Sequence, residues 1–106
     1  MRERDIENYL VKCVNDMGGE VRKVQWIGRR GAPDRLVMLP PSFKRDAGDV
    51  LFYESQTIWV ELKAPGAKPR PSQEREHERM RAMGQHVEVI DSLQGVDELL
   101  MKEKNK

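Results

Sequence analysis

Two acidic residues with apolar neighbours are the side chains of this sequence best placed to do chemistry. Asp34 follows a Gly-Ala-Pro turn, and Glu61 lies between Val60 and Leu62, two positions before Lys63. Side chains alternate across a β-strand with a period of two, so Glu61 and Lys63 are expected to project from the same face of one strand. A carboxylate and an ammonium group would then lie side by side, with a second carboxylate on a different strand.

This set of groups suits the hydrolysis of a phosphodiester. Mg²⁺ takes one or two carboxylates and otherwise keeps waters and phosphate oxygens, so Asp34 and Glu61 can supply its protein ligands, with the backbone carbonyl of Leu62 as a further candidate. The cation would lower the pKa of a bound water, while Lys63 orients that water and offsets negative charge. The simpler alternative is an ordinary ion pair between Glu61 and Lys63, with Asp34 as a turn residue. Spacing alone does not separate the two interpretations.

The apolar pattern up to Lys63 predicts one helix followed by three strands. Apolar residues at helical spacing, ended by Gly18 and Gly19, predict a helix over residues 3–17. Runs of β-branched, aromatic and other apolar residues predict strands over 21–27, 36–39 and 58–63. The segment 41–57 is irregular, and we expect an extra strand or a hairpin arm there.

After the third strand, a proline-rich loop leads into a second helix. Ser72 is expected to cap this helix, which spans residues 73–83. Gln73 shares a helical stripe with His77, so it is predicted to face the core although it is polar. The chain then completes the order α-β-β-β-α-β-α with a last strand and a C-terminal helix, over 86–91 and from Leu93 onward. The fold class is therefore α/β, with a central mixed sheet flanked by helices.

The composition indicates the number of domains, the size of the core and the cellular compartment. The 106 residues suit a single domain over 1–106, and 38% hydrophobic with 35% charged residues leaves a thin core that dimerisation would complete. The single cysteine, Cys13, cannot form an internal disulfide, and no stretch is long and apolar enough to span a membrane. We therefore expect a soluble cytoplasmic protein without a secretory signal.

Positive charge is concentrated beside the acidic residues, although the formal net charge is only +1. Basic residues flank Asp34 and follow Lys63, namely Arg29, Arg30, Arg35, Lys68 and Arg70. We expect these side chains to contact the phosphates of a nucleic acid. The alternative is that they only keep the protein in solution. His77 and His86 lack the spacing of a zinc site, and neither is expected to be catalytic.

Three motifs follow one another along the chain, namely Gly31-Ala32-Pro33-Asp34-Arg35, Val60-Glu61-Leu62-Lys63 and Pro71-Ser72-Gln73. Together with an acidic first helix, they resemble the VRR-NUC family of the PD-(D/E)XK nuclease superfamily over nearly the whole chain. The resemblance implies a restriction-endonuclease-like α/β core that binds Mg²⁺ or Mn²⁺. Gln73 matches the glutamine of the family's helix. The segment 41–57 is longer than the family pattern.

The resemblance also implies roles for individual residues. Asp34 and Glu61 would be metal ligands, and Lys63 would be the catalytic lysine. Glu7 resembles the first-helix acid that reaches the metal directly or through water. Glu3 lies one turn away and is the alternative for that position.

Stand-alone members of the family resemble Holliday junction resolvases and act as homodimers. The resemblance therefore implies a homodimeric DNA endonuclease that is selective for branched DNA such as four-way junctions, in a bacterial or phage-infected cell. No recognition helix that would read base sequence is evident. Two alternatives stay open: a non-catalytic DNA-binding or assembly module with a nuclease fold, and an RNA-processing nuclease that uses the same chemistry.

Overall fold

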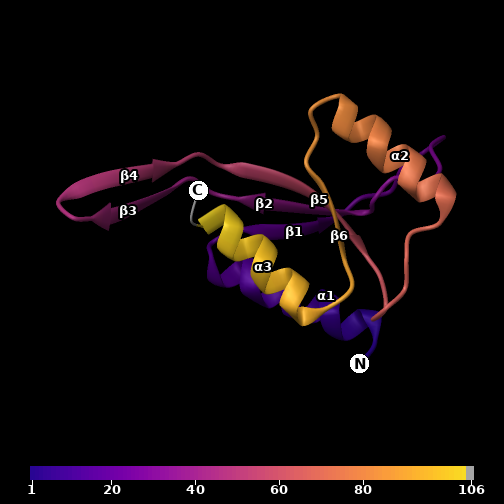
Figure 1. The fold of residues 1–106 in the computed structure, drawn as a ribbon, viewed down its shortest axis with the longest axis horizontal. Helices are drawn as coiled ribbons and strands as arrows, with labels where there is room; N and C mark the ends of the chain where they lie inside the picture. Colours follow the sequence, from indigo (N-terminus) through magenta and orange to yellow (C-terminus); the bar gives the residue numbers. More distant parts are fainter. Residues whose placement is uncertain (105–106) are drawn as a thin grey trace.

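The computed structural model describes the backbone of residues 1–104 and the side chains of residues 1–101 (Figure 1). Its elements, in chain order, are α1 (Glu3–Asp16), β1 (Glu20–Lys23), β2 (Arg35–Leu39), β3 (Ser42–Asp46), β4 (Asp49–Tyr53), β5 (Gln56–Leu62), α2 (Pro71–Ala82), β6 (Val87–Ile90) and α3 (Leu93–Lys104). Among the described residues, no helix is both long and apolar enough to cross a membrane. The predicted α/β class is confirmed, while β3 and β4 add two strands that the predicted order lacks.

A four-stranded mixed sheet in the order β1-β2-β5-β6 forms the centre of the fold. β1 and β5 both run antiparallel to β2, whereas β6 runs parallel to β5. Because β2 and β5 run in opposite directions, the start of β2 lies beside the end of β5. Arg35 pairs with Val60, so the preceding residue, Asp34, lies next to Glu61. The sheet therefore brings together two carboxylates that are far apart in the sequence.

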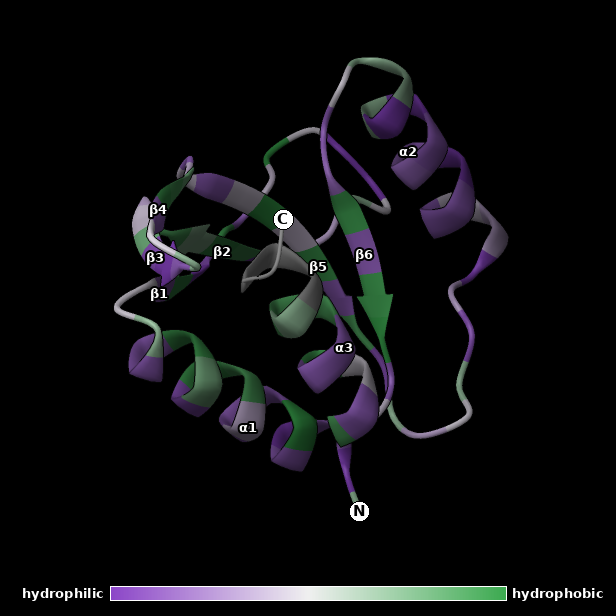
Figure 2. Ribbon diagram, turned by 60° about the vertical axis from the view of Figure 1, so that its left-hand side comes forward, coloured by the Kyte–Doolittle hydropathy of each residue, from purple (hydrophilic) through white to green (hydrophobic). Residues whose placement is uncertain are grey.

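The inner strand β5 separates an apolar face from a polar one. Ile58, Val60 and Leu62 are buried in the main apolar cluster. Helices α1 and α3 pack on this face through residues that include Ile6, Leu10, Val14, Val96 and Leu99. The three from α1 recur every four positions and so form one helical stripe. Because α2 lies on the opposite side of the sheet (Figure 2), β5 turns Trp59 and Glu61 toward α2.

The strands β3 and β4 form a separate two-stranded hairpin, called here the hairpin arm (residues 42–53), which projects beyond the sheet (Figure 1). Ala47 and Gly48 at its tip have φ values of 50° and 86°. Two consecutive left-handed residues are what a type I′ hairpin turn requires. Phe43 and Phe52 pair across the strands with ring centroids 5.2 Å apart, and both are exposed. The hairpin arm expected in the 41–57 segment is thus confirmed.

The first strand is shorter than its sequence pattern predicts. β1 ends at Lys23 rather than near Ile27, so the second half of that prediction is wrong. Trp26 lies beyond the end of this strand, and its Nε1 donates to the carbonyl oxygen of Pro33, 2.8 Å away. Its ring also packs against Trp59, with centroids 5.2 Å apart. The β-forming residues therefore build the loop that leads to the carboxylate site.

The start of α2 also differs from the prediction. The helix begins at Pro71, with Arg70 rather than Ser72 at the N-cap, so the predicted cap is wrong. Proline suits the first helical turn because its φ matches the helix and its missing N–H would have no helical partner there. Gln73 supplies the capping contact, since its Oε1 accepts the Arg70 backbone N–H at 2.9 Å.

Candidate active site

Glu61 is a buried carboxylate on the α2 face of β5. Burial raises its pKa to about 7, and the nearby carboxylates of Asp34 and Glu3 act in the same direction. Lys63 and Arg35 oppose this shift, since positive charge favours the ionised form. The ionised form of Glu61 therefore lacks hydration and has too little positive charge nearby. A bound cation would compensate for both.

Lys63 is held in position by the first turn of α2. Its Nζ donates to Gln73 Oε1 at 2.8 Å, and the same oxygen accepts the backbone N–H of Arg70. Gln73 therefore points toward the sheet, in agreement with its predicted helical stripe. The amide oxygen ties the lysine to the helix, so the ammonium group has a defined place on the strand face that also carries Glu61.

Arg35, the first residue of β2, is buried and connects two of the candidate acids. Its Nη1 lies 2.8 Å from Asp34 Oδ1, and its Nε and Nη2 contact Glu7 Oε2. Glu7 thus reaches the site from α1 through the arginine, whereas Glu3, one turn earlier, is near enough to raise the pKa of Glu61. The guanidinium expected to contact phosphate is instead held between two carboxylates of the protein itself.

His77 is a residue of the site that the sequence pattern did not single out for chemistry. Its side chain is only 1% exposed, and its Nε2 lies 3.5 Å from Glu61 Oε1 without a hydrogen-bond partner among the described residues. Burial lowers the pKa of His77, and the positive charges of Arg81 and Lys63 lower it further. The imidazole is therefore neutral at neutral pH. The sequence feature that could have indicated His77 is its position four residues after Gln73, on the same inward-facing helical stripe.

The donor set fits a hard divalent cation. Among the described residues, no group of three or more His, Cys, Asp or Glu side chains is gathered as a ready ligand cluster. Mg²⁺ does not require one, because one or two carboxylates and several waters satisfy it. Asp34, which immediately precedes β2, and Glu61 of β5 supply neighbouring carboxylates, and the backbone carbonyl of Leu62 is the further candidate ligand. A cation between the two acids would offset the burial that raises the pKa of Glu61 and the smaller contribution of repulsion from Asp34.

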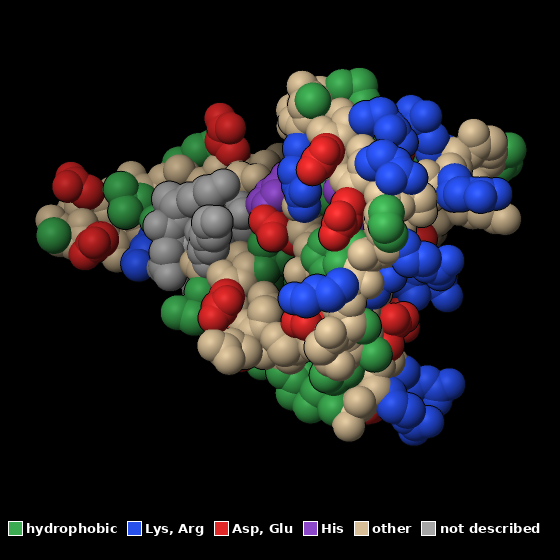
Figure 3. Space-filling view, turned by 45° about the vertical axis from the view of Figure 1, so that its right-hand side comes forward, with side chains coloured by type: hydrophobic (Ala, Val, Ile, Leu, Met, Phe, Trp, Pro, Cys, Tyr) green, Lys and Arg blue, Asp and Glu red, His purple; other side chains and the backbone are tan. Residues whose placement is uncertain are grey.

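Exposed basic side chains lie near this site. Figure 3 shows Lys and Arg side chains gathered on the side of the molecule that carries α2, away from the hairpin arm. Arg30, Lys68 and Arg70 are exposed, as a contact with an external phosphate requires. Arg29 is also exposed but forms an ion pair with Glu76, a buried acid that no sequence pattern indicated.

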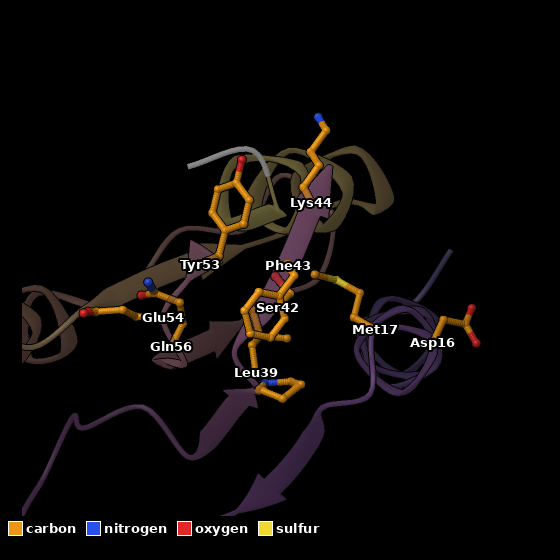
Figure 4. A pocket seen from close by; sticks show the side chains of 10 residues that line it. Asp16, Met17, Leu39, Ser42, Phe43, Lys44, Tyr53, Glu54 and Gln56 are labelled. Atoms are coloured by element: carbon orange, nitrogen blue, oxygen red, sulfur yellow. The ribbon is translucent and has the colours of Figure 1, made fainter. Parts of the chain in front are cut away.

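A pocket of 370 Å³ lies elsewhere, between the end of α1 and the base of the hairpin arm (Figure 4). Its lining includes the apolar side chains of Met17, Leu39 and Phe43, together with Tyr53. None of the candidate catalytic residues lines it. The pocket is therefore separate from the carboxylate site.

A mixed sheet with a buried glutamate and a helix-held lysine at the end of an inner strand, next to an aspartate from the neighbouring strand, defines an α/β nuclease core of the PD-(D/E)XK type. A solved structure of a VRR_NUC domain has the same fold, with a TM-score of 0.72 and 38% sequence identity, over 93% of this chain and 94% of that chain. The chain belongs to the VRR-NUC family.

A phage protein is also similar to this chain. "Putative nuclease p44" of Acyrthosiphon pisum secondary endosymbiont phage 1 is 46% identical over 92 residues, which are 87% of this chain and 85% of that protein. No family model matches the sequence. The assignment to the family therefore rests on these two relatives, and it confirms the resemblance stated from the three motifs.

Proposed function

We propose that this protein is a divalent-metal-dependent endonuclease that hydrolyses phosphodiester bonds in DNA. The observation that carries the proposal is the 2.8 Å hydrogen bond from Lys63 to Gln73, which holds an ammonium group beside the buried carboxylate of Glu61. A lysine that only paired with a surface acid would need no partner on α2. The similarity to a phage protein named as a nuclease supports the same conclusion.

Asp34 and Glu61 would hold Mg²⁺ or Mn²⁺, with the carbonyl of Leu62 as an additional ligand and waters in the remaining positions. The cation, when bound, supplies a more acidic water and stabilises charge on the phosphate. Glu61 lies in β5 and Asp34 immediately precedes β2, and the hydrogen-bonded pairing of these strands sets the separation of the two backbone positions. The site is therefore rigid on the side that would carry the metal.

The other residues of the site orient the reacting groups. Lys63 places positive charge next to the scissile phosphate and directs a hydrogen bond to the attacking water. Gln73 fixes that ammonium group. Glu7 acts through Arg35, because the guanidinium that it holds in turn orients Asp34.

The substrate that this surface fits is DNA contacted through its backbone. Arg30, Lys68 and Arg70 are exposed on the loops that lead into and out of the site, so they can neutralise phosphates without reading bases. Described helices already cover the two faces of the sheet, which leaves none to enter a major groove as a separate reader. Selectivity would then come from the shape of the nucleic acid, and branched DNA such as a four-way junction is the proposed substrate.

The direct test is a cleavage panel of four-way junction, flap, single-stranded and linear duplex DNA, each with Mg²⁺, with Mn²⁺ and with EDTA. We expect cleavage of the branched substrates with either metal and none with EDTA. Glu98→Gln, which changes an exposed acid on α3, is the matched control and should cleave normally. Absence of cleavage on every substrate with both metals would favour the non-catalytic DNA-binding module.

A homodimer is the proposed assembly. An isolated two-stranded hairpin is marginally stable in water, and the hairpin arm exposes Phe43, Val50 and Phe52. A second copy that pairs with this arm would cover the apolar surface and place two complete sites on opposite strands of a junction. Light scattering at micromolar concentration should give twice the mass of the chain. Replacing Phe52 and Tyr53 with charged residues should abolish the paired incision, and a wild-type protein that stays monomeric with and without junction DNA would exclude the dimer.

A further inference from the structure

A buried acid of α2, Glu76, joins two arginines. The side chain of Glu76 is 2% exposed, and its Oε2 lies 3.1 Å from Arg29 Nε. Its Oε1 accepts from Arg79 Nε at 3.0 Å and from Nη2 at 2.7 Å. Arg29 comes from the loop between β1 and β2, whereas Arg79 is three positions further along α2. We call these three residues the Glu76 cluster, and its formal charge is +1.

The loop that carries Arg29 is fixed against α2 by its backbone as well. Gly31 has a φ of 85°, and a Cβ atom at this position would lie 2.7 Å from the backbone oxygen of Ser72. The loop therefore touches the first turn of the helix so closely that no side chain fits between them. At its other end, the carbonyl of Pro33 accepts the indole N–H of Trp26. The position of Arg29 is thus set by the surrounding structure and not by its ion pair alone.

Glu76 does not occupy all the hydrogen-bond donors of the two arginines that it holds. The side chains of Arg29 and Arg79 are 49% and 53% exposed, while their shared partner is enclosed. A guanidinium has five N–H donors; Arg29 Nε forms an ion pair with Glu76, and Arg79 donates two hydrogen bonds to it. Each arginine therefore keeps donors that can face solvent. A buried carboxylate requires compensation for its lost hydration, which makes it a poor choice for stability alone.

From this geometry we propose that Glu76 is a positioning residue that holds Arg29 and Arg79 as a fixed pair of phosphate-binding groups beside the active site. The inference rests on the proposed action on DNA. It adds Arg79 to the residues expected to contact the DNA backbone, and it adds a residue that orients both Arg79 and Arg29. Guanidinium groups bind phosphate oxygens through paired hydrogen bonds, so their value depends on orientation as well as charge. Holding both side chains before binding reduces the conformational entropy lost on association. The loop with Arg29 leads to Asp34, and α2 carries Gln73, so the cluster joins both halves of the site.

The test is DNA binding without metal, so that it does not depend on cleavage. Affinity for a four-way junction is measured in EDTA over a series of salt concentrations. Arg29→Ala and Arg79→Ala should each weaken binding several-fold and reduce the salt slope by about one, because each removes one phosphate contact. Either variant with an unchanged affinity and slope would overturn the inference.

The discriminating variant is Glu76→Gln, compared with Glu78→Gln. Both remove one negative charge from α2, and Glu78 is exposed. Simple charge attraction predicts that both bind DNA more tightly. We expect Glu78→Gln to bind as tightly as the wild type or slightly more tightly, and Glu76→Gln to bind at least several-fold more weakly. Equal or tighter binding by Glu76→Gln would overturn the inference.

A second pair of variants covers the case in which Glu76→Gln fails to fold, as judged by circular dichroism. Arg29→Lys and Arg79→Lys keep the charge but lose the forked geometry. They should weaken binding while the salt slope stays near the wild-type value, and wild-type affinity would contradict the inference. If the protein binds DNA with this pattern but cleaves no substrate, the proposed role of the Glu76 cluster is supported and the endonuclease proposal is refuted. A wild-type chain that binds no DNA would overturn both.

Discussion

The two faces of β5 are built from opposite kinds of side chain. On one face, Ile58, Val60 and Leu62 are buried among aliphatic residues of α1 and α3. On the other face, Glu61 is buried beside His77, and the following Lys63 is bound to α2 by an amide oxygen. Both faces are covered by helices, yet the first consists of non-directional apolar contacts and the second of directed polar ones.

Stability and chemistry therefore reside on different faces of this small fold. Burial of an aliphatic side chain contributes about 1.5–3 kcal/mol, so the apolar face can hold the sheet together by itself. The α2 face buries Glu61, the Glu76 carboxylate and a histidine whose Nε2 has no hydrogen-bond partner among the described residues. Burying such groups disfavours the folded state unless they are compensated. The first face should therefore dominate folding, and the second should dominate catalysis.

The largest expected effect concerns the carboxylates of the polar side. Asp34→Ala or Glu61→Ala should lower the single-turnover cleavage rate about 1,000-fold or more, because each removes a candidate metal ligand. DNA affinity in EDTA should be unchanged or slightly tighter, since one negative charge is lost near the phosphates. Cleavage by either variant within a few-fold of the wild-type rate would refute the metal assignment.

Truncating a side chain on the apolar face should lower stability and leave the cleavage rate of the folded protein nearly unchanged. Leu10→Ala should lower the free energy of unfolding by about 3 kcal/mol, because Leu10 is fully buried between α1 and the sheet. Urea denaturation measures this change, with the exposed Asn8→Ala on the same helix as the control. The fraction that remains folded should cleave at nearly the wild-type rate. A stable Leu10→Ala protein with abolished cleavage would break the division between the faces.

Lys63 tests whether the polar face does chemistry or only binds the cation. Lys63→Ala should reduce the cleavage rate about 100-fold at saturating metal while metal affinity changes little, since the ammonium group acts on water and phosphate. Metal titration followed by single-turnover kinetics separates the two quantities. Lys63→Arg keeps the charge and is the comparison variant. Normal turnover of Lys63→Ala at high metal concentration would reduce the lysine to a structural role.

The smallest expected effect is a gain in stability from removing the buried charge. The pKa of Glu61 is raised from 4.5 to about 7 in the folded protein, so the folded state binds this proton more tightly than the unfolded state does. The stabilisation of the folded state by this bound proton is fully present below pH 4.5, and it is lost as the pH rises through about 7. Glu61→Gln, which stays neutral, should therefore stabilise the metal-free protein at pH 8 by roughly 2 kcal/mol and have little effect at pH 4.

Thermal melts at the two pH values measure this gain, and adding Mg²⁺ should stabilise the wild type more than Glu61→Gln. Glu98→Gln, an exposed change on α3, is the control and should shift neither melt. Equal stability of Glu61→Gln and the wild type at pH 8 without metal would mean that burial does not disfavour the ionised form of Glu61.

Local patterns in the sequence predicted much of both faces. The period of two in β5 placed Glu61 and Lys63 together and opposite Val60, and the helical stripe of α2 turned Gln73 inward. These predictions succeed because, within a helix or strand, the backbone geometry alone fixes which residues share a face. The same local logic failed for residues 24–27, whose β-forming side chains build a loop instead of a strand.

The α/β class, the helix and strand periods and the motifs that identify the family could be predicted from the sequence, since each depends on residues close together in the chain. Which polar groups are enclosed depends instead on tertiary contacts. Arg35 is held by Glu7 of α1, and Glu76 forms an ion pair with Arg29 from the loop between β1 and β2, because segments distant in sequence pack around them. The physical reason is that burial and ion pairing depend on what the rest of the fold places around a side chain, which no local pattern encodes.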